Sequence, residues 1–351
     1  MTDTPDKTLA NQSGDSGTCR LPVTVIMTVK DDLEGCLTTL WSLHAQTRQP
    51  AQIVVVDGGS RREAIAAMRA HVVERPAVEL IEAPGANIAA GRNIATQAAR
   101  HEIIASIDAG CRAADDWLEK LVKPLIAGPS IGFVAGNYRV DTRALFEQVV
   151  GLATMRGQLD PVDPRKFNPS ARSLAYRREV WKRAGGWPEW IRYSEDTLFD
   201  ERVRKLDVGW AFVADAVVHW RPRTSWRGLA KQFYHYGTGR GHTQMGRADF
   251  LYNLRNLLLL LMLVVASLWS RWFAAPLAGH VLYFYVWAFH AKSLRIARRT
   301  DCTLAYPLSL VVHWVVLLSH LTGFLVGSMQ RWFDKPRYVT STAAYLGGSK
   351  V

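Results

Sequence analysis

The sequence predicts an α/β protein followed by membrane-associated helices. In the first third of the chain, short apolar segments alternate with stretches of helical periodicity. This alternation is typical of a parallel sheet with right-handed helical crossovers. Long apolar stretches then occur within 256–289 and 303–327, and both ranges are longer than the roughly 20 residues needed to cross a bilayer. The predicted fold is therefore a Rossmann-like, mostly parallel sheet with flanking helices, followed by interfacial and transmembrane helices.

Four apolar runs define the strands of the predicted sheet. They lie at 23–29, 53–56, 78–81 and 103–107. Helical patterns include 33–46, 86–100 and 115–127. In the fourth run, IIASI, apolar residues occupy successive positions, as expected of a central strand buried on both faces. Beyond Gly128 the alternation ends, and the sequence predicts one more strand at 131–138 and a Pro-rich loop at 158–170, of a kind that is often functional.

The net charge limits the class of partner, and the cysteine spacing limits the kinds of metal site and crosslink. The chain of 351 residues has a formal net charge of +12, which suits nucleic acid, anionic lipid or phosphorylated substrates. The apolar stretches favour lipid, and no nucleic-acid motif is present, so we predict no nucleic-acid partner. The cysteines lack C-x-x-C spacing and indicate neither a zinc site nor a disulfide framework. They are Cys19, Cys36, Cys111 and Cys302.

Composition divides the chain into five predicted regions. These are a disordered tail at 1–20, an α/β domain at 21–223, an interfacial amphipathic segment at 224–250, about three transmembrane helices at 251–330 and a tail at 331–351. The interfacial segment carries aromatic and apolar residues at helical spacing, and an ordinary surface helix would give the same pattern. Its glycine-rich end, GTGRG, lacks the Lys-Ser/Thr of a phosphate-binding loop. We predict a flexible hinge there.

Basic residues predict the membrane orientation. The loop 290–301 holds four Lys and Arg residues, and the positive-inside rule places it in the cytoplasm. With three spans, this agrees with a multi-pass protein of the inner (plasma) membrane whose amino-terminal domain is cytoplasmic. The same topology puts Arg331, Lys335 and Arg337 outside, which fits the rule poorly.

Acidic residues follow three of the predicted strands. Asp31 or Asp32 follows the first, Asp57 the second and Asp108 the fourth. Adjacent ends of parallel strands meet at one crevice, so Asp57 and Asp108 are candidates for contact with the same ligand. The alternative is that each acid caps a helix or a turn, which is the commoner role of a single acid at such a position.

Four motifs in fixed order carry a family resemblance. They are VTVIMTVKDD, IVVVDGGS, GANIAAGRNIATQAARHEIIASIDAG and SEDTLFDERVRK. Together they resemble the family 2 glycosyltransferases of the GT-A fold, over about residues 21–240. The segment PRTSWRGLAKQFYHYGTGRG, with the membrane helices after it, resembles the subgroup typified by the succinoglycan-biosynthesis glucosyltransferases.

The resemblance implies a nucleotide site. It assigns Thr28, Lys30, Asp57, Arg92 and Asp108 to that site, with Asp57 accepting hydrogen bonds from the base. Many relatives have an aromatic residue where Lys30 stands. Asp108 matches the first acid of the D-x-D motif, which holds Mg²⁺ or Mn²⁺ against the donor diphosphate. The motif here reads Asp108-Ala109-Gly110, so its last acid is missing.

The resemblance also implies which residues act in the sugar transfer. Asp196 matches the general base, and Glu195 supports the acceptor or the base; the alternative is an acidic pair that complements a helix dipole. Trp187 either packs on a sugar ring or is a core residue. Diphosphate-binding candidates are His219, Arg221, Gln232, Tyr236 and Arg240. His219 is alternatively a metal ligand or a structural residue. Gln232, Tyr236 and Arg240 lie at i, i+4 and i+8, and the alternative is that this helical face serves packing.

These assignments imply an inverting hexosyltransferase. It would move a sugar from a nucleoside diphosphate donor, preferably UDP, to a hydroxyl of a lipid-linked glycan. A nucleotide-dependent oxidoreductase is disfavoured because no G-x-G-x-x-G follows the first strand. A catalytically silent membrane scaffold remains the alternative, because the D-x-D motif is incomplete.

Overall fold

The structure of the chain is a computed structural model that describes residues 20–73, 75–155, 158–159 and 167–347. The predicted amino-terminal tail with Cys19 and most of the predicted Pro-rich loop lie outside these residues. The strands are β1 (Leu21–Val29), β2 (Pro50–Asp57), β3 (Val78–Glu82), β4 (Ile103–Ser106), β5 (Cys111–Ala113), β6 (Ile131–Val140), β7 (Leu174–Arg177) and β8 (Gly209–Trp220).

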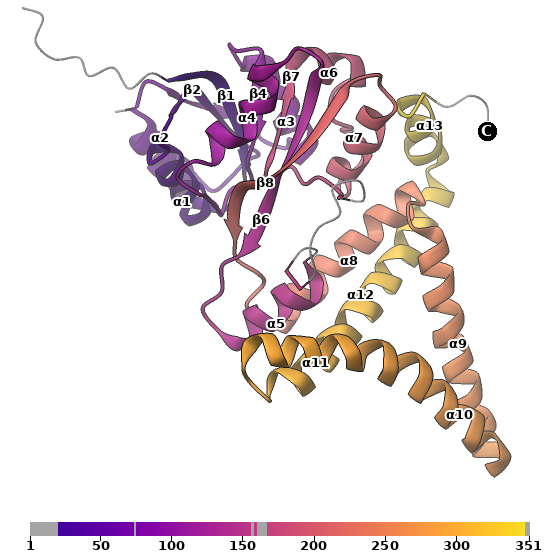
Figure 1. Ribbon diagram of the computed structural model, residues 1–351. Helices are drawn as coiled ribbons and strands as arrows, with labels where there is room; N and C mark the ends of the chain where they lie inside the picture. The colour runs from indigo at the N-terminus through magenta and orange to yellow at the C-terminus, as the bar shows by residue number, and fades with distance from the viewer. Residues whose placement is uncertain (1–19, 74, 156–157, 160–166, 348–351) are drawn as a thin grey trace, which may run out of the picture.

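The helices flank this sheet and then continue beyond it (Figure 1). They are α1 (Leu33–His44), α2 (Arg62–Val73), α3 (Ile88–Ala98), α4 (Trp117–Ala127), α5 (Leu145–Thr154), α6 (Arg178–Ala184), α7 (Glu195–Arg204), α8 (Trp226–Thr243), α9 (Arg247–Trp269), α10 (Ala274–His280), α11 (Ala288–Thr300), α12 (Ala305–Phe333) and α13 (Ser341–Tyr345).

The described strands form one mixed sheet in the order β3-β2-β1-β4-β7-β6-β8-β5. The four strands predicted first, β1 to β4, pair in parallel. This half of the sheet confirms the predicted crossover pattern. The other half is added mainly antiparallel, since β7 pairs antiparallel with both β4 and β6, and β5 pairs antiparallel with β8. The fold is thus the predicted α/β class with a mixed sheet.

Both faces of the sheet are covered, which explains why its central strands are mostly apolar. Val25 and Met27 of β1 pack in a cluster with residues of α1, α2 and α4. Ile26, between them, enters a second cluster with residues of α3, α6 and α7. Successive side chains of a strand point to opposite faces, so a strand covered on both sides is apolar at most positions. The exception Thr24 of β1 is buried and donates a hydrogen bond to Gln52 of β2 (2.8 Å).

Helix α8 lies against α12 through glycines. The predicted hinge, residues 237–241, is wrong because these residues continue α8. A Cβ atom on Gly237 would contact the carbonyl oxygen of His320, and one on Gly323 would contact the carbonyl oxygen of Tyr234. Small residues four apart let two helix backbones approach closely. The glycines therefore serve packing and not bending.

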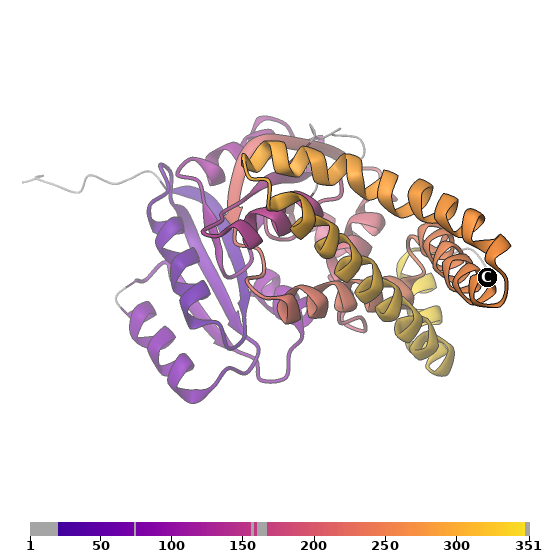
Figure 2. The same cartoon turned by 90° about the horizontal axis from the view of Figure 1, so that it is seen from below.

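Three helical segments are long and apolar enough to cross a membrane. They are Arg247–Trp269, Arg271–Thr300 and Ala305–Phe333. The second is a continuous run in which a stretch of π-helix, Val281–Trp287, joins α10 to α11. Figure 1 shows the three segments as the sides of a triangle, with α12 nearest α8, and Figure 2 shows α11 and α12 diverging from one corner.

Candidate active site

A cavity of about 1500 Å³ lies between the carboxyl ends of the parallel strands and the helices α8 and α12. Nine of the predicted site residues line it. They are Thr28, Lys30, Arg92, Asp108, Glu195, Asp196, Gln232, Tyr236 and Arg240. The crevice at the strand ends is where open α/β sheets bind ligands. Residues from distant parts of the sequence therefore meet at the expected place.

Asp108 differs from the other acids that follow strands. The Asp31 carboxylate accepts a hydrogen bond from the Arg61 amide (3.0 Å), and Asp32 caps α1 by accepting one from the Gly35 amide (3.0 Å). Asp57 is fully buried and forms a turn, in which it accepts hydrogen bonds from the amides of Gly59 and Ser60. Asp31, Asp32 and Asp57 thus accept hydrogen bonds from backbone amides, as expected of acids that cap a helix or a turn, and Asp31 also pairs with the exposed Arg61 (3.7 Å). The Asp108 carboxylate instead meets two largely buried arginine side chains.

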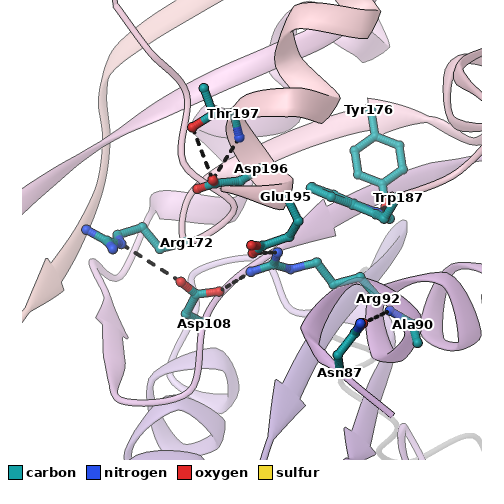
Figure 3. Close-up of polar contacts among 10 residues, drawn as sticks. All are labelled: Asn87, Ala90, Arg92, Asp108, Arg172, Tyr176, Trp187, Glu195, Asp196 and Thr197. Atoms are coloured by element: carbon teal, nitrogen blue, oxygen red, sulfur yellow. Dashed lines mark hydrogen bonds and ion pairs between the residues drawn. The ribbon is translucent and has the colours of Figure 1, made fainter. Parts of the chain in front are cut away.

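Arg92 joins two acids that lie 87 positions apart in the sequence. Its Nη2 donates to Oδ1 of Asp108 (2.8 Å), and its Nη1 donates to Oε1 of Glu195 (2.7 Å) (Figure 3). Burial by itself would lower the pKa of Arg92, but the two carboxylates hold it above its ordinary value. The guanidinium also lies 4.9 Å from the centre of the Trp187 ring. The side chain is 5% exposed, so Arg92 is a fixed cation at the base of the site.

Arg172 is a second cation of the site, which the sequence analysis missed. Its Nε lies 3.9 Å from Oδ2 of Asp108, and its guanidinium lies 4.9 Å from the Trp220 ring and 5.3 Å from the Tyr138 ring. The Nε is buried and has no hydrogen-bond partner among the described residues. Figure 3 shows Arg92 and Arg172 approaching Asp108 from opposite sides. No short motif surrounds Arg172, so only spatial proximity identifies it.

Glu195 and Asp196 begin α7 and have different surroundings. Glu195 is buried against Arg92. Burial and the charge of Asp196 raise its pKa to about 7, although Arg92 opposes this rise. The Asp196 carboxylate accepts hydrogen bonds from the amide (2.7 Å) and hydroxyl (3.4 Å) of Thr197. Asp196 faces the cavity with acceptor capacity to spare, whereas Glu195 is held in an ion pair.

Trp187, His219 and Arg221 lie outside the cavity wall. Trp187 is 2% exposed and stacks on Phe199 with ring centres 4.0 Å apart, so the core alternative describes it. Its contact with Arg92 supports the site from behind. His219 lies within β8, paired with β5. Arg221 donates to the buried carboxylate of Glu147 (2.7 Å), which directs its charge away from the cavity.

Helix α8 supplies the wall opposite the acids. Gln232 donates to the Tyr236 hydroxyl (2.9 Å) and accepts from Nε of Arg223 (3.2 Å). Gln232 and Tyr236 line the cavity together with Arg240, as the spacing of the three residues predicts for one helical face. His235 stacks on Tyr193, with ring centres 4.3 Å apart, at the same wall. This wall is rich in cations and donors.

The residues suit a divalent cation that is shared with a ligand. The described residues contain no group of three or more His, Cys, Asp or Glu that could hold a metal alone. Oδ2 of Asp108 is beyond hydrogen-bond distance of Arg172. Gly110 stands where the D-x-D motif has its last acid. A Cβ atom built on Gly110 would lie 3.7 Å from Oδ2 of Asp32, so the Asp32 carboxylate lies close to the position of the missing acid. Asp32 and Asp108 are thus the carboxylates available to a cation at this wall.

A family comparison agrees with this geometry. Residues 24–180 match the family described as Glycosyl transferase family 2. The match covers slightly under half of the chain and shows that this region resembles a family 2 glycosyltransferase domain. The matched range runs from β1 into α6 and includes Arg92 and Asp108. Asp196 and the α8 wall lie beyond it, and the match does not distinguish the succinoglycan subgroup.

Three solved structures resemble this chain. The mannosyltransferase PcManGT from Pyrobaculum calidifontis, in complex with GDP-Man and Mn²⁺, is 19% identical, with a TM-score of 0.47 over 93% of this chain and 85% of that one. GalNAc-T7 with UDP, GalNAc and Mn²⁺ is 15% identical, with a TM-score of 0.48 over 69% and 51% of the two chains.

The third structure, residues 1–349 of S. aureus TarS, is 13% identical, with a TM-score of 0.45 over 89% of this chain and 91% of that one. Among curated proteins, none matches the sequence. At these identities the likeness concerns the fold alone. It assigns neither a substrate nor a residue role to this chain.

Proposed function

We propose that the protein is an inverting glycosyltransferase, which moves a hexose from a nucleoside diphosphate, preferably UDP, to a hydroxyl of a lipid-linked glycan. One observation carries this proposal. The cavity holds a carboxylate with spare acceptor capacity, Asp196, across from a wall of cations and beside the Arg92–Asp108 pair. The family 2 domain supports the same activity.

Asp196 is the general base of this proposal. Inversion requires that the acceptor oxygen attack the anomeric carbon from the side opposite the leaving diphosphate, and a base takes the hydroxyl proton as the new bond forms. Asp196 has the free acceptor positions for this proton, because Thr197 occupies only one of its oxygens. Glu195 holds Arg92 and thereby positions the base beside the donor site.

Cations stabilise the leaving diphosphate. Charge develops on the phosphate oxygens as the glycosidic bond breaks, and fixed positive groups in a buried site lower the energy of that state. Arg172 is held in place by two aromatic rings, and its Nε has no other partner among the described residues. Arg240, Gln232 and Tyr236 line the facing wall. Thr28 and Lys30 are the nucleoside-side residues of the same cavity.

A divalent cation, Mg²⁺ or Mn²⁺, would be held by Asp108 and Asp32 together with the donor phosphates. It would supply further positive charge to the diphosphate. Because Arg92 and Arg172 lie beside Asp108, the free protein offers a cation little net negative charge. We therefore infer that the cation enters with the nucleotide and not before it.

Calorimetric titration of the detergent-solubilised protein tests this function. UDP, GDP and NAD are each titrated with and without Mn²⁺. We expect UDP or GDP to bind, with affinity that rises with Mn²⁺, and Mn²⁺ alone not to bind. If a nucleotide binds with the same affinity with and without Mn²⁺, the transferase proposal stands but the proposed cation site is wrong. No binding of any nucleotide would favour the silent scaffold.

A further inference from the structure

The three apolar segments differ in how much of their surface the protein covers. The described structure buries 11% of the most apolar part of α9 and 6% of that of Arg271–Thr300, but 28% of that of α12. The exposed large apolar residues of α9 include adjacent pairs, so they lie on several sides of the helix. They are Leu251, Tyr252, Leu258, Leu261, Met262, Val264, Val265, Leu268 and Trp269. A helix that is apolar nearly all round suits the interior of a bilayer.

Helix α12 exposes apolar residues on one face only. These residues are Val311, Leu318, Leu325, Met329, Trp332 and Phe333. Their separations up to Trp332 are seven, seven, four and three residues, which is the spacing of a single stripe on an α-helix. The opposite face packs on protein, through Gly323 and Gly327 against α8 and through Val312 in a cluster with α5. Helix α12 therefore has one apolar stripe free for contact with lipid and is covered by protein on its other side, while its mean hydropathy, 1.8, equals that of α9.

The partner of α12 is a polar helix. Lys231 of α8 is exposed, and Arg240 of the same helix lines the cavity. The close glycine contacts hold α12 at the level of this helix. A crossing by α12 would draw α8 and its charges into the hydrocarbon, where charged side chains are unfavourable. The packing therefore keeps α12 on the surface of the bilayer.

The segment after α12 returns to the catalytic domain. Nε of Arg337 donates to the Trp190 carbonyl (2.9 Å), and the Tyr345 hydroxyl donates to the Gly186 carbonyl (2.7 Å). The Tyr345 ring meets the Trp190 ring with centres 5.0 Å apart and is 9% exposed. The carboxyl-terminal segment must therefore lie on the same side of the membrane as the active site.

The other two segments lead away from the domain and back. The basic end of α11 contacts α5, where Nζ of Lys292 donates to the Ala153 carbonyl (2.6 Å). At the far end, the turn between α9 and α10 exposes Trp269 (93%) and Trp272 (80%) beside Arg271. Aromatic and basic residues of this kind are enriched where a chain meets the headgroups. At about 1.5 Å per residue, the 23 residues of α9 extend about 35 Å, more than the roughly 30 Å of the hydrocarbon core.

We propose that the chain crosses the membrane twice, as a hairpin of Arg247–Trp269 and Arg271–Thr300, while α12 lies with α8 in the interface on the catalytic side. The carboxyl terminus is then on the catalytic side. This topology removes the poor fit of the predicted three spans to the positive-inside rule. Arg331, Lys335 and Arg337 join the basic end of α11 on the cytoplasmic side, and Arg271 is on the far side.

Cysteine labelling of the full chain in sealed vesicles tests the topology. Ser270→Cys probes the hairpin turn, Thr340→Cys the carboxyl-terminal segment and Lys123→Cys the catalytic domain. Cys19 and Cys302 are replaced by Ser in all variants. Cys36 and Cys111 stay, because burial raises the pKa of both thiols to about 12 and leaves them unreactive. The label is a membrane-impermeant maleimide.

We expect Thr340→Cys and Lys123→Cys to be labelled from one side and Ser270→Cys only from the other. If Thr340→Cys and Ser270→Cys are labelled from the same side and Lys123→Cys only from the opposite side, the chain crosses three times and the proposal is overturned. Labelling of all three from one side would show that the hairpin does not cross. Arg271→Cys and Lys335→Cys repeat the two decisive positions. The result does not depend on transferase activity.

Discussion

At the scale of the residue, Arg92 organises the site. It neutralises two acids that would otherwise repel each other, Asp108 and Glu195, and both contacts are shorter than 3 Å. A buried ion-pair network of this kind is strongly destabilised when one partner is removed, because the remaining charges are left without compensation. Among the described residues, Asp196 makes no direct contact in this network, and this separates the acids that hold Arg92 from the proposed base.

The base is tested by Asp196→Asn. The amide keeps the size of the side chain but cannot take a proton, so we expect turnover to fall by about 10²- to 10⁴-fold. UDP affinity should stay within about twofold, because Asp196 is assigned to the acceptor side. Sugar transfer and calorimetric UDP binding are measured together. Asp207→Asn, the same change at an exposed position after α7, is the control; near-normal turnover of Asp196→Asn would remove the assignment.

The cation site is tested by Asp32→Asn. The amide oxygen can still accept the hydrogen bond from the Gly35 amide and so cap α1. A metal ligand is lost, however, so we expect Mn²⁺ to enhance UDP affinity about tenfold less than in the wild type. The readout is calorimetric UDP binding across a Mn²⁺ series. Asp31→Asn, at the neighbouring acid that pairs with Arg61, should behave as wild type; an unchanged Mn²⁺ response in Asp32→Asn would contradict the role.

At the scale of the element, the contact between α8 and α12 couples the cavity wall to the membrane. Gly237 and Gly241 of α8 face Gly323 and Gly327 of α12, and a Cβ at any of the four would meet backbone of the other helix. Gln232, Tyr236 and Arg240 stand on the same α8. The position of these cavity residues therefore depends on how closely the two helices approach.

Gly323→Ala tests this contact. Its Cβ would overlap the Tyr234 carbonyl oxygen, and backbone atoms cannot move aside as a flexible side chain does. Overpacking of this kind costs about 1–3 kcal/mol, so we expect a lower midpoint of thermal unfolding in detergent and weaker nucleotide binding. Gly279→Ala, where nothing lies within 4 Å of the added atom, is the matched control. Equal midpoints for the two variants would show that the helices separate freely.

At the scale of the whole molecule, the active site is assembled from both ends of the chain. The cavity has one wall from the sheet and another from α8 and α12, and the carboxyl-terminal segment docks on residues 186–190, shortly before the proposed base Asp196. An acceptor attached to a lipid would meet Asp196 without leaving the membrane surface. The resulting effective concentration favours transfer to that acceptor.

Docking of the carboxyl-terminal segment is tested by Tyr345→Ala. Loss of the hydroxyl bond to the Gly186 carbonyl and of the ring contact with Trp190 loosens the segment that leads into α7. Misplaced catalytic groups cost rate more than affinity, so we expect turnover to fall by about tenfold or more with UDP affinity unchanged. Turnover and UDP affinity are measured separately. Thr340→Ala, at an exposed position, is the control; a loss of UDP binding in Tyr345→Ala would indicate general unfolding.

The sequence by itself determined the parallel half of the sheet, the apolar helices and the motifs around Asp108 and Asp196. These features depend on local sequence patterns. Strand and helix periodicities need only neighbouring residues, and the ends of parallel strands converge regardless of the sequence that comes later in the chain. The tertiary structure alone decided the antiparallel strands β5 and β7, the pairing of β8 with β6, the role of the glycines and the partnership of Arg172 with Asp108. Each of these depends on contact between residues far apart in the chain, and no local pattern encodes which distant segment will supply the partner.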